Sequence, residues 1–236
     1  TVLAYGQTGS GKSHTLFGGL TADEAYLRGD ERAAVEGITC RAVRRIFDHA
    51  AEQEERGARV SVSATLLEIY NESIHDLLLP LVPTGPARPP LLLREDVERS
   101  EVHVRGLTEV PMHDANKALS LVCRALRMRA VRATNANARS SRSHAVLQLL
   151  IEQTEPAAGS AEERPPVLRS KLSLVDLAGS ERTNTHAASV GVHHSRERSR
   201  INASLSALAT CIQALTDKGR PHVPYRDSLL TRILQT

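Results

Sequence analysis

Hydrophobic residues recur at helical spacing in three stretches of the chain. The first stretch, 39–55, places its apolar residues on one side of an amphipathic helix, at Val43, Ile46, Phe47 and Ala50. The same periodicity predicts a helix over 113–133, with Leu119, Val122 and Leu126 facing inward, and another over 201–215. Glycine and proline at 219–224 end the third helix before a last helical stretch.

Short apolar or alternating runs predict strands between these helices. They lie at 2–5, 60–70, 91–94, 102–104, 145–152 and 171–175. Five prolines and a glycine at 80–90 predict a surface loop rather than a domain boundary, because strand-like segments resume after it. Strands and helices that alternate through one chain indicate a layered α/β fold.

The composition is that of an ordinary globular protein and excludes a wholly disordered or fibrous chain. The chain has 236 residues, of which 41% are hydrophobic and 24% charged, enough for one large domain or two small ones. No apolar run is long enough to span a membrane, and the first residues lack the features of a signal peptide. Three widely spaced cysteines predict neither a metal site nor a disulfide framework, and they suit a reducing cytosol.

Positive charge is concentrated in the last quarter of the chain. From Arg182 onward, eight basic residues stand against three acidic ones, whereas the first 181 residues carry a small negative net charge. This asymmetry favours an acidic partner at the C-terminal end, with a basic, solvated surface as the alternative. Tyr225 is the only aromatic residue in that quarter, so a base-stacking platform and nucleic-acid binding are not expected.

A phosphate-binding loop follows the first predicted strand. The residues Gly6-Gln7-Thr8-Gly9-Ser10-Gly11-Lys12-Ser13 match G-x-x-x-x-G-K-[ST] in full. Glycines let backbone N–H groups turn toward the phosphates, and Lys12 can reach the β- and γ-phosphates. The Ser13 hydroxyl can bind Mg²⁺, and a helix starting at about Lys12 directs its positive end at the triphosphate.

Two further segments have the chemistry to sense a γ-phosphate. Asp176 ends an apolar strand, where a carboxylate can hold Mg²⁺ through water, and the Gly179 N–H that follows can approach the phosphate. The run 137–144 combines hydroxyls, an amide and a cation before a strand, although by itself it also fits an ordinary polar loop. Arg142 and Glu181 suggest an ion pair that closes the two segments over the nucleotide.

Taken together, these segments resemble the kinesin motor domain. The phosphate loop, the N-x-x-S-S-R-S-H run at 137–144 (switch I) and Asp-Leu-Ala-Gly-Ser-Glu at 176–181 (switch II) are similar to the family's motifs. Further kinesin-like blocks are Leu-Glu-Ile-Tyr-Asn-Glu at 67–72, Ile-Asn-Ala-Ser-Leu-Ser-Ala-Leu at 201–208, and the block 222–228. The resemblance covers nearly the whole chain in the family's order.

The resemblance implies a fold and an activity. The fold would be a P-loop NTPase of the kinesin/myosin type, with a central, mainly parallel mixed β-sheet and helices on both faces. Residues 1–236 would form a partial motor domain that lacks both ends of the family's domain. The activity would be a microtubule-stimulated ATPase that uses ATP and Mg²⁺ in the cytoplasm, on the cytoskeleton. No membrane contact is expected, and oligomerisation is left to a coiled coil outside this chain.

The resemblance also assigns roles to individual residues. Nucleotide would be bound by Gly6, Gln7, Thr8, Gly9, Ser10, Gly11, Lys12, Ser13 and His14. Mg²⁺ would be held by Ser13, Ser141 and, through water, Asp176. The catalytic set would be Asn137, Ser140, Ser141, Arg142, Gly179 and Glu181. The relay helix and the microtubule-binding region would occupy about 196–236, with contacts from Arg196, Arg198, Arg200, Lys218, Arg220, Arg226 and Arg232.

Several positions depart from the family's pattern. Ser13 stands where threonine is usual, which keeps the hydroxyl, whereas Arg198 replaces a small residue. Leu229 stands where a lysine is expected, and the loop 183–195 is longer than usual and lacks a Thr-Gly pair. These departures fall mostly in the filament-binding region. The alternative function is therefore a non-catalytic or weakly active microtubule-binding relative, or an inactive fragment of a motor.

Overall fold

A central sheet organises the chain in this computed structural model, which describes residues 1–21, 36–81, 90–96, 101–134, 139–155, 166–181, 192–217, 219–220 and 222–235. The strands run in the order β1-β8-β7-β2-β3, with β6 also paired to β2. Their bounds are β1 Val2–Ala4, β2 Arg59–Tyr70, β3 Ser73–Asp76, β6 Val110–Met112, β7 His144–Thr154 and β8 Val167–Asp176. A separate hairpin pairs β4 (Leu92–Asp96) with β5 (Glu101–Arg105).

The sheet is mixed, as expected, but the prediction that it is mainly parallel is wrong for the described strands. Only β1 and β8 pair in parallel within the part of the chain that the structure describes. Strands β2 and β3 are joined through Asn71 and Glu72, which is too short for a crossover, so they pair antiparallel. Strands β7 and β8 are also consecutive along the chain and pair with each other.

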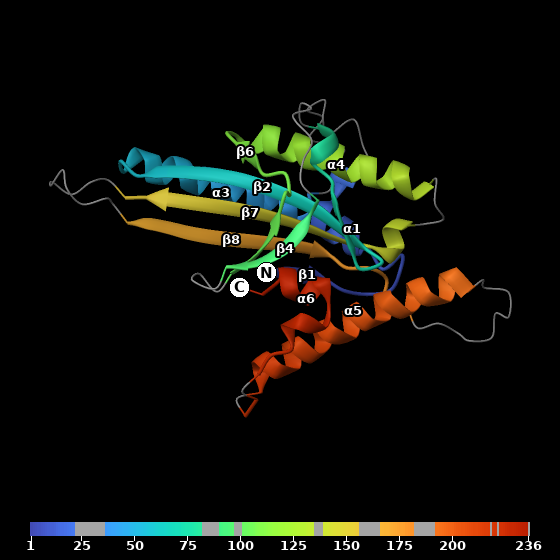
Figure 1. Cartoon of the computed structure of the whole chain (residues 1–236). Coiled ribbons are helices and arrows are strands. Elements are labelled where there is room, and N and C mark those ends of the chain that lie inside the picture. The colour runs from blue at the N-terminus through green and yellow to red at the C-terminus, as the bar shows by residue number, and fades with distance from the viewer. Residues whose placement is uncertain are drawn as a thin grey trace.

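Helices cover both faces of the sheet (Figure 1). One face packs against α1 (Lys12–Phe17), α3 (Ile38–Glu55) and α4 (Ala115–Thr134), through alternate strand residues such as Ala64 and Leu66 of β2. The opposite face packs against α5 (Val192–Thr216) and α6 (Leu229–Ile233), through Leu67 and Ile69 of the same strand. The two apolar sets of β2 differ in parity, which is the alternation that a strand buried on both faces requires.

The predicted helices are confirmed, with shifted ends. The helix expected over 39–55 is α3, that over 113–133 is α4, and that over 201–215 is α5, which begins nine residues earlier than expected. The polar start of α5 carries little hydrophobic periodicity, so the pattern did not show it. Short 3₁₀ helices lie at η1 Gly19–Thr21, η2 Leu79–Leu81, η3 Arg139–Arg142 and η4 Tyr225–Asp227.

The predicted strands are also confirmed, and two further strands were not predicted. Strands β3 and β6 have four and three residues, too few to produce a clear alternation. Most of the predicted surface loop, 82–89, lies outside the described residues. Among the helices of the described ranges, none has the length and apolarity needed to cross a bilayer.

Candidate functional site

The phosphate-loop sequence connects the end of β1 to the start of α1, as predicted. Gly9 and Gly11 have φ values of 80° and 90°, in the left-handed region that favours glycine, and Gly11 is the N-cap of α1. Because β1 pairs in parallel with β8, with Ala4 opposite Asp176, the loops that follow both strands lie at the same edge of the sheet. The pairing therefore brings the loop 6–13 beside the segment 177–181.

Asp176 joins these two loops through a buried carboxylate. The Ser13 hydroxyl donates to Asp176 Oδ2 at 2.7 Å, and Asp176 is only 3% exposed. Its other oxygen, Oδ1, is buried and accepts no hydrogen bond from the residues that the structure describes. A hydroxyl beside a carboxylate with a buried oxygen to satisfy fits Mg²⁺, which prefers oxygen ligands and retains several waters.

Arg129 is a functional candidate that sequence reasoning missed. Its guanidinium, 6% exposed, lies 3.2 Å from Asp176 and 3.4 Å from Glu68, and it also donates to the Ser143 carbonyl at 3.0 Å. Glu68 accepts from the Ser143 hydroxyl at 2.6 Å. A signal was present, because Arg129 follows Val122 by seven residues and so continues the inward side of α4. A cation on that side is costly unless it is paired, which indicates buried acids opposite it.

The phosphate loop and the segment after β8 are tied together by Glu181. Its carboxylate accepts from the Thr8 backbone N–H at 2.9 Å and from the Thr8 hydroxyl at 2.5 Å. Burial raises the pKa of Glu181, but the hydrogen bonds from Thr8, the backbone N–H of Glu181 itself and the charge of Lys12 together lower the pKa below the ordinary value. A Cβ at position 179 would overlap this carboxylate and the Thr8 hydroxyl, so a side chain there would displace the contact between Glu181 and Thr8.

Several groups expected to face a phosphate have partners within the protein. The Gly179 N–H donates to the Ser141 carbonyl at 2.9 Å, and Lys12 Nζ donates to the Gln7 carbonyl at 2.8 Å. Ser180 N–H likewise donates to the Gly6 carbonyl. The hydrogen bonds that the structure gives to Glu181 come from Thr8, so the pair between Arg142 and Glu181 stays a prediction.

A small cavity of about 120 Å³ lies where the three predicted segments meet. Thr8 of the phosphate loop, Ser141 and Arg142 of η3, and Gly179 and Glu181 after β8 all line it. The remaining wall comes from α5, through Arg198, Ile201 and Asn202. Segments more than 100 residues apart in sequence thus converge on one site, as the motifs predicted.

Comparison with known proteins identifies the family. The model of the kinesin motor domain matches residues 1–236, which is the whole chain. The chain belongs to the kinesin motor domain family. Kinesin-related protein 5 of Dictyostelium discoideum is 41% identical over the whole chain, and kinesin-like protein 3 of Schizosaccharomyces pombe is 40% identical over 235 residues. The chain spans only 22% and 38% of the lengths of these two relatives.

Solved kinesin structures confirm the fold. A fast kinesin superposes with a TM-score of 0.78 at 38% identity, covering 99% of this chain and 59% of that chain. The motor domain of Kar3 from Saccharomyces cerevisiae superposes with a TM-score of 0.75 at 29% identity, covering 99% of this chain and 62% of that one. The P-loop NTPase fold of the kinesin type, with its mixed central sheet, is therefore confirmed.

The remaining site residues that the kinesin resemblance predicted are placed unevenly. His14 lies exposed in α1, one residue after Ser13. Asn137 lies outside the described residues, and of Ser140 only the backbone, in η3, is described. The predicted positions that the structure describes with side chains, from Gly6 to Ser13 and from Ser141 to Glu181, all lie at the sheet edge where β1 and β8 end.

The cations predicted to face a filament fall into three groups. Arg200 donates to Asn71 Oδ1 at 2.9 Å, and Arg226 lies 3.1 Å from Glu95, so both have partners within this kinesin chain. Arg220 is exposed after α5, and Arg232 is half-buried in α6. Arg198 differs, because it lines the cavity beside Glu181. The side chain of Arg196 and the whole of Lys218 lie outside the described part.

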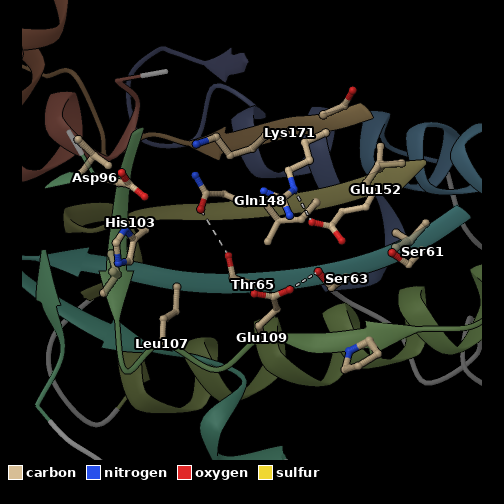
Figure 2. A pocket seen from close by; sticks show the side chains of 18 residues that line it. Ser61, Ser63, Thr65, Asp96, His103, Leu107, Glu109, Gln148, Glu152 and Lys171 are labelled. Atoms are coloured by element: carbon tan, nitrogen blue, oxygen red, sulfur yellow. Dashed lines mark hydrogen bonds and ion pairs between the residues drawn. The ribbon is translucent and has the colours of Figure 1, made fainter. Parts of the chain in front are cut away.

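A larger cavity of about 660 Å³ lies at the other end of the sheet, away from the phosphate loop (Figure 2). Its floor is polar, with Ser63 and Thr65 of β2, Gln148 and Glu152 of β7, and Lys171 of β8. None of the residues predicted for nucleotide or Mg²⁺ lines this cavity. Arg169 pairs there with Glu152 at 2.7 Å, and the Ser63 hydroxyl donates to Glu109.

Proposed function

We propose that this chain is the nucleotide-binding core of a microtubule-stimulated ATPase motor. The observation that carries the proposal is the convergence at one sheet edge of a complete phosphate loop with the two segments that would sense its γ-phosphate. The Ser13–Asp176 hydrogen bond ties the phosphate loop to β8 at the point where hydrated Mg²⁺ would be held. Family membership supports the same reading, since a named structural relative is described by its ATPase mechanism and its interactions with microtubules.

The proposal assigns each group a task. Residues Gly6 to His14 would cradle the ATP phosphates and their ribose side, with Lys12 at the β- and γ-phosphates. The hydroxyls of Ser13 and Ser141 would be Mg²⁺ ligands, and Asp176 would hold a water of the ion. Bound Mg²⁺ supplies charge neutralisation on the β- and γ-oxygens during phosphoryl transfer. Asn137, Ser140 and the pair of Arg142 with Glu181 would orient the attacking water.

Nucleotide binding on this proposal requires an exchange of partners. A phosphate at the loop would replace the Gln7 carbonyl as the partner of Lys12, and the Ser141 carbonyl as the partner of the Gly179 N–H. Glu181 would then leave Thr8 and pair with Arg142 across the same cavity. These exchanges are discrete, so the presence or absence of the γ-phosphate would select between two arrangements of the switch segments.

The proposed filament surface is the side of α5 and α6. Arg196, Arg200, Lys218, Arg220, Arg226 and Arg232 would meet the acidic surface of tubulin, whereas we place Arg198 with the nucleotide site because of the cavity that it lines. Cytoplasmic localisation on microtubules follows from this partner. Binding should weaken as salt rises, because exposed charges are screened within about 8 Å at physiological ionic strength.

Steady-state phosphate release, with and without microtubules, tests the proposal. Lys12→Ala should lower the stimulated rate by at least about a hundredfold, which is the usual loss when one electrostatic contact to the reacting group is removed. Lys171→Ala, in the larger cavity, is the matched control and should change the rate less than twofold. Stimulation that survives Lys12→Ala would overturn the proposal.

The alternative is a relative that binds microtubules without nucleotide control. The departures at Arg198 and Leu229 motivate it, because they lie in the region that would couple the filament to the nucleotide site. It predicts equal cosedimentation with microtubules in ADP and in a non-hydrolysable ATP analogue. Cosedimentation that depends on the nucleotide excludes it.

A further inference from the structure

His144 connects three elements of the proposed motor through one buried side chain. It is the first residue of β7, separated from Arg142 of η3 only by Ser143, and it is 3% exposed. The Ala178 N–H, in the segment between Asp176 and Gly179, donates to His144 Nδ1 at 3.0 Å. On the other side of the ring, Nε2 lies 2.9 Å from the hydroxyl of Ser204 in α5.

The partners fix which group donates and which accepts in each hydrogen bond that links Ala178, His144 and Ser204. A backbone N–H can only donate, so Nδ1 carries no proton, and the neutral ring must carry its proton on Nε2. The Ser204 hydroxyl gives its own proton to the Ile201 carbonyl at 2.8 Å, so its oxygen accepts from Nε2. The result is a single directed chain that runs from Ala178 N–H through His144 and Ser204 to the backbone of α5.

The surroundings keep the ring neutral. Burial, followed by the charge of Arg129, lowers the pKa of His144 to about 4. A second proton on Nδ1 would also face the Ala178 N–H, donor against donor. The hydrogen bonds from Ala178 to α5 therefore have only one possible donor–acceptor direction. If the 177–181 segment or α5 moved away from His144, a buried polar group would be left unsatisfied, at a cost of about 1–3 kcal/mol.

We propose that His144 is a positioning residue that couples the 177–181 segment to α5, so that a shift of Gly179 toward a phosphate moves the helix with it. The inference rests on the proposed function and deepens it, because it names the contact through which the nucleotide site acts on the filament side. His144 touches neither the phosphate loop nor Asp176 in the hydrogen bonds that the structure gives it. Leu177 packs in the same apolar cluster as Leu208 of α5, which keeps loop and helix adjacent while the hydrogen bonds set their register.

The first test removes the last hydrogen bond of the series, where His144 meets Ser204 of α5. Ser204→Ala removes the acceptor of Nε2–H and leaves His144 in place, and Cys211→Ala, a buried truncation two turns along α5, is the matched control. We expect Ser204→Ala to lower microtubule stimulation of phosphate release about tenfold, within the usual range of coupling between sites, with the basal rate changed less than twofold. His144→Asn keeps an acceptor near Nδ1 but cannot reach Ser204, and it should show the same loss.

The double variant His144→Asn/Ser204→Ala distinguishes coupling from simple loss of stability. Both substitutions interrupt the same series of hydrogen bonds, so the double variant should lose no more microtubule stimulation than either single variant. Additive losses in the double variant would overturn the inference. It would also be overturned if stimulation and basal rate fell equally and in proportion to the free energy of unfolding, as expected for Cys211→Ala, because the role of His144 would then be structural only.

A second measurement needs no catalysis and so separates this inference from the proposed function. In the nucleotide-free chain, Ser204→Ala should speed hydrogen exchange of the Ala178 amide at least fivefold, whereas Cys211→Ala should not, and the ¹⁵N shifts of His144 should report a proton on Nε2. If exchange responds while the unsubstituted chain shows no microtubule stimulation, the proposed function fails and the link stands. If exchange at Ala178 is indifferent to Ser204, the link itself is refuted.

Discussion

One face of the central sheet has two ends that differ in chemistry. Near the phosphate loop, Leu67, Val146 and Val175 pack beneath α5 and α6, and the polar groups beside them form directed, buried hydrogen bonds. Further along the same strands, Thr65 and Gln148 belong to the polar floor of the larger cavity. Cavity volume alone therefore indicates the opposite end of the sheet from the one where the motifs lie. Buried charge and converging hydrogen bonds locate it at the end where the motifs lie.

The largest expected effect comes from the buried cation at the nucleotide end. Arg129→Met would leave Glu68 and Asp176 as uncompensated buried acids, so the free energy of unfolding should fall by about 3–5 kcal/mol. Arg169→Met removes the exposed pair with Glu152 at the polar end and should cost at most about 1 kcal/mol. Urea unfolding of both variants measures the difference. Equal losses would show that the two ends do not differ in the way that their burial implies.

The contrast between the ends also shows what the sequence could reveal. The phosphate loop and the two switch segments were predicted because their residue types and spacings are local properties of the chain. Their meeting at one edge followed from β1 and β8, whose predicted strands were confirmed. The helical spacing of α4 places Arg129 on the inward side, but it does not show which acids meet it, because those partners come from β2 and β8, far away in the sequence.

Other differences between prediction and structure have equally local causes. The strand direction was misjudged because the mainly parallel sheet was taken from the family resemblance, whereas in this chain a two-residue turn at Asn71 and Glu72 joins β2 to β3 as an antiparallel pair. The resemblance grouped Arg198 with the filament cations, and its place in the wall of the small cavity depends on how α5 packs, which the sequence does not show. Sequence reasoning thus located the motifs and the elements that bear them better than it located individual side chains.

The second prediction concerns pH and separates His144 from the rest of the nucleotide end. The folded-state pKa of His144, about 4, lies below its ordinary value of 6.5, so the unfolded chain takes up this proton first as pH falls. The stability contributed by the neutral ring is present above pH 6.5 and declines toward pH 4, by about 2 kcal/mol between pH 6.5 and 4.5.

This pH window isolates the histidine from the two described acids whose pKa values are also lowered, Asp114 and Glu181. Asp114 has an ordinary pKa of 3.8, below the window, and a lower one when folded. Glu181 has an ordinary value of 4.5 and a lower one when folded, so its contribution is lost below the window. Urea unfolding at several pH values should give a steep decline for the parent chain and a shallower one for His144→Asn. The same slope in both chains would contradict the assignment of a buried, neutral His144.

The third prediction tests whether Arg198 of α5 acts at the nucleotide site or at the filament surface. Its position beside Thr8 and Glu181 predicts that Arg198→Ala raises the KM for ATP at least about tenfold and leaves the half-saturating microtubule concentration unchanged, since a hydrogen bond to a charged group contributes about 1.5–3 kcal/mol. Arg220→Ala, an exposed cation just after the same helix, should do the reverse. If Arg198→Ala changed microtubule binding and left the KM for ATP unchanged, Arg198 would belong to the filament surface.

The smallest expected effect concerns an exposed ion pair. It joins Arg226, in the segment between α5 and α6, to Glu95 of the β4–β5 hairpin. Glu95 holds Arg226 at 3.1 Å, and Arg226 is among the cations proposed to meet tubulin, so the acid and the filament compete for one guanidinium. Glu95→Ala should therefore tighten microtubule binding about twofold at low salt, and Arg226→Ala should weaken it, with both effects fading as salt screens exposed charge. In the double variant the benefit of removing Glu95 should disappear, because it acts only through Arg226. Tightening that persists without Arg226 would instead show that Glu95 repels tubulin directly, and the intramolecular pair would then have no part in filament affinity.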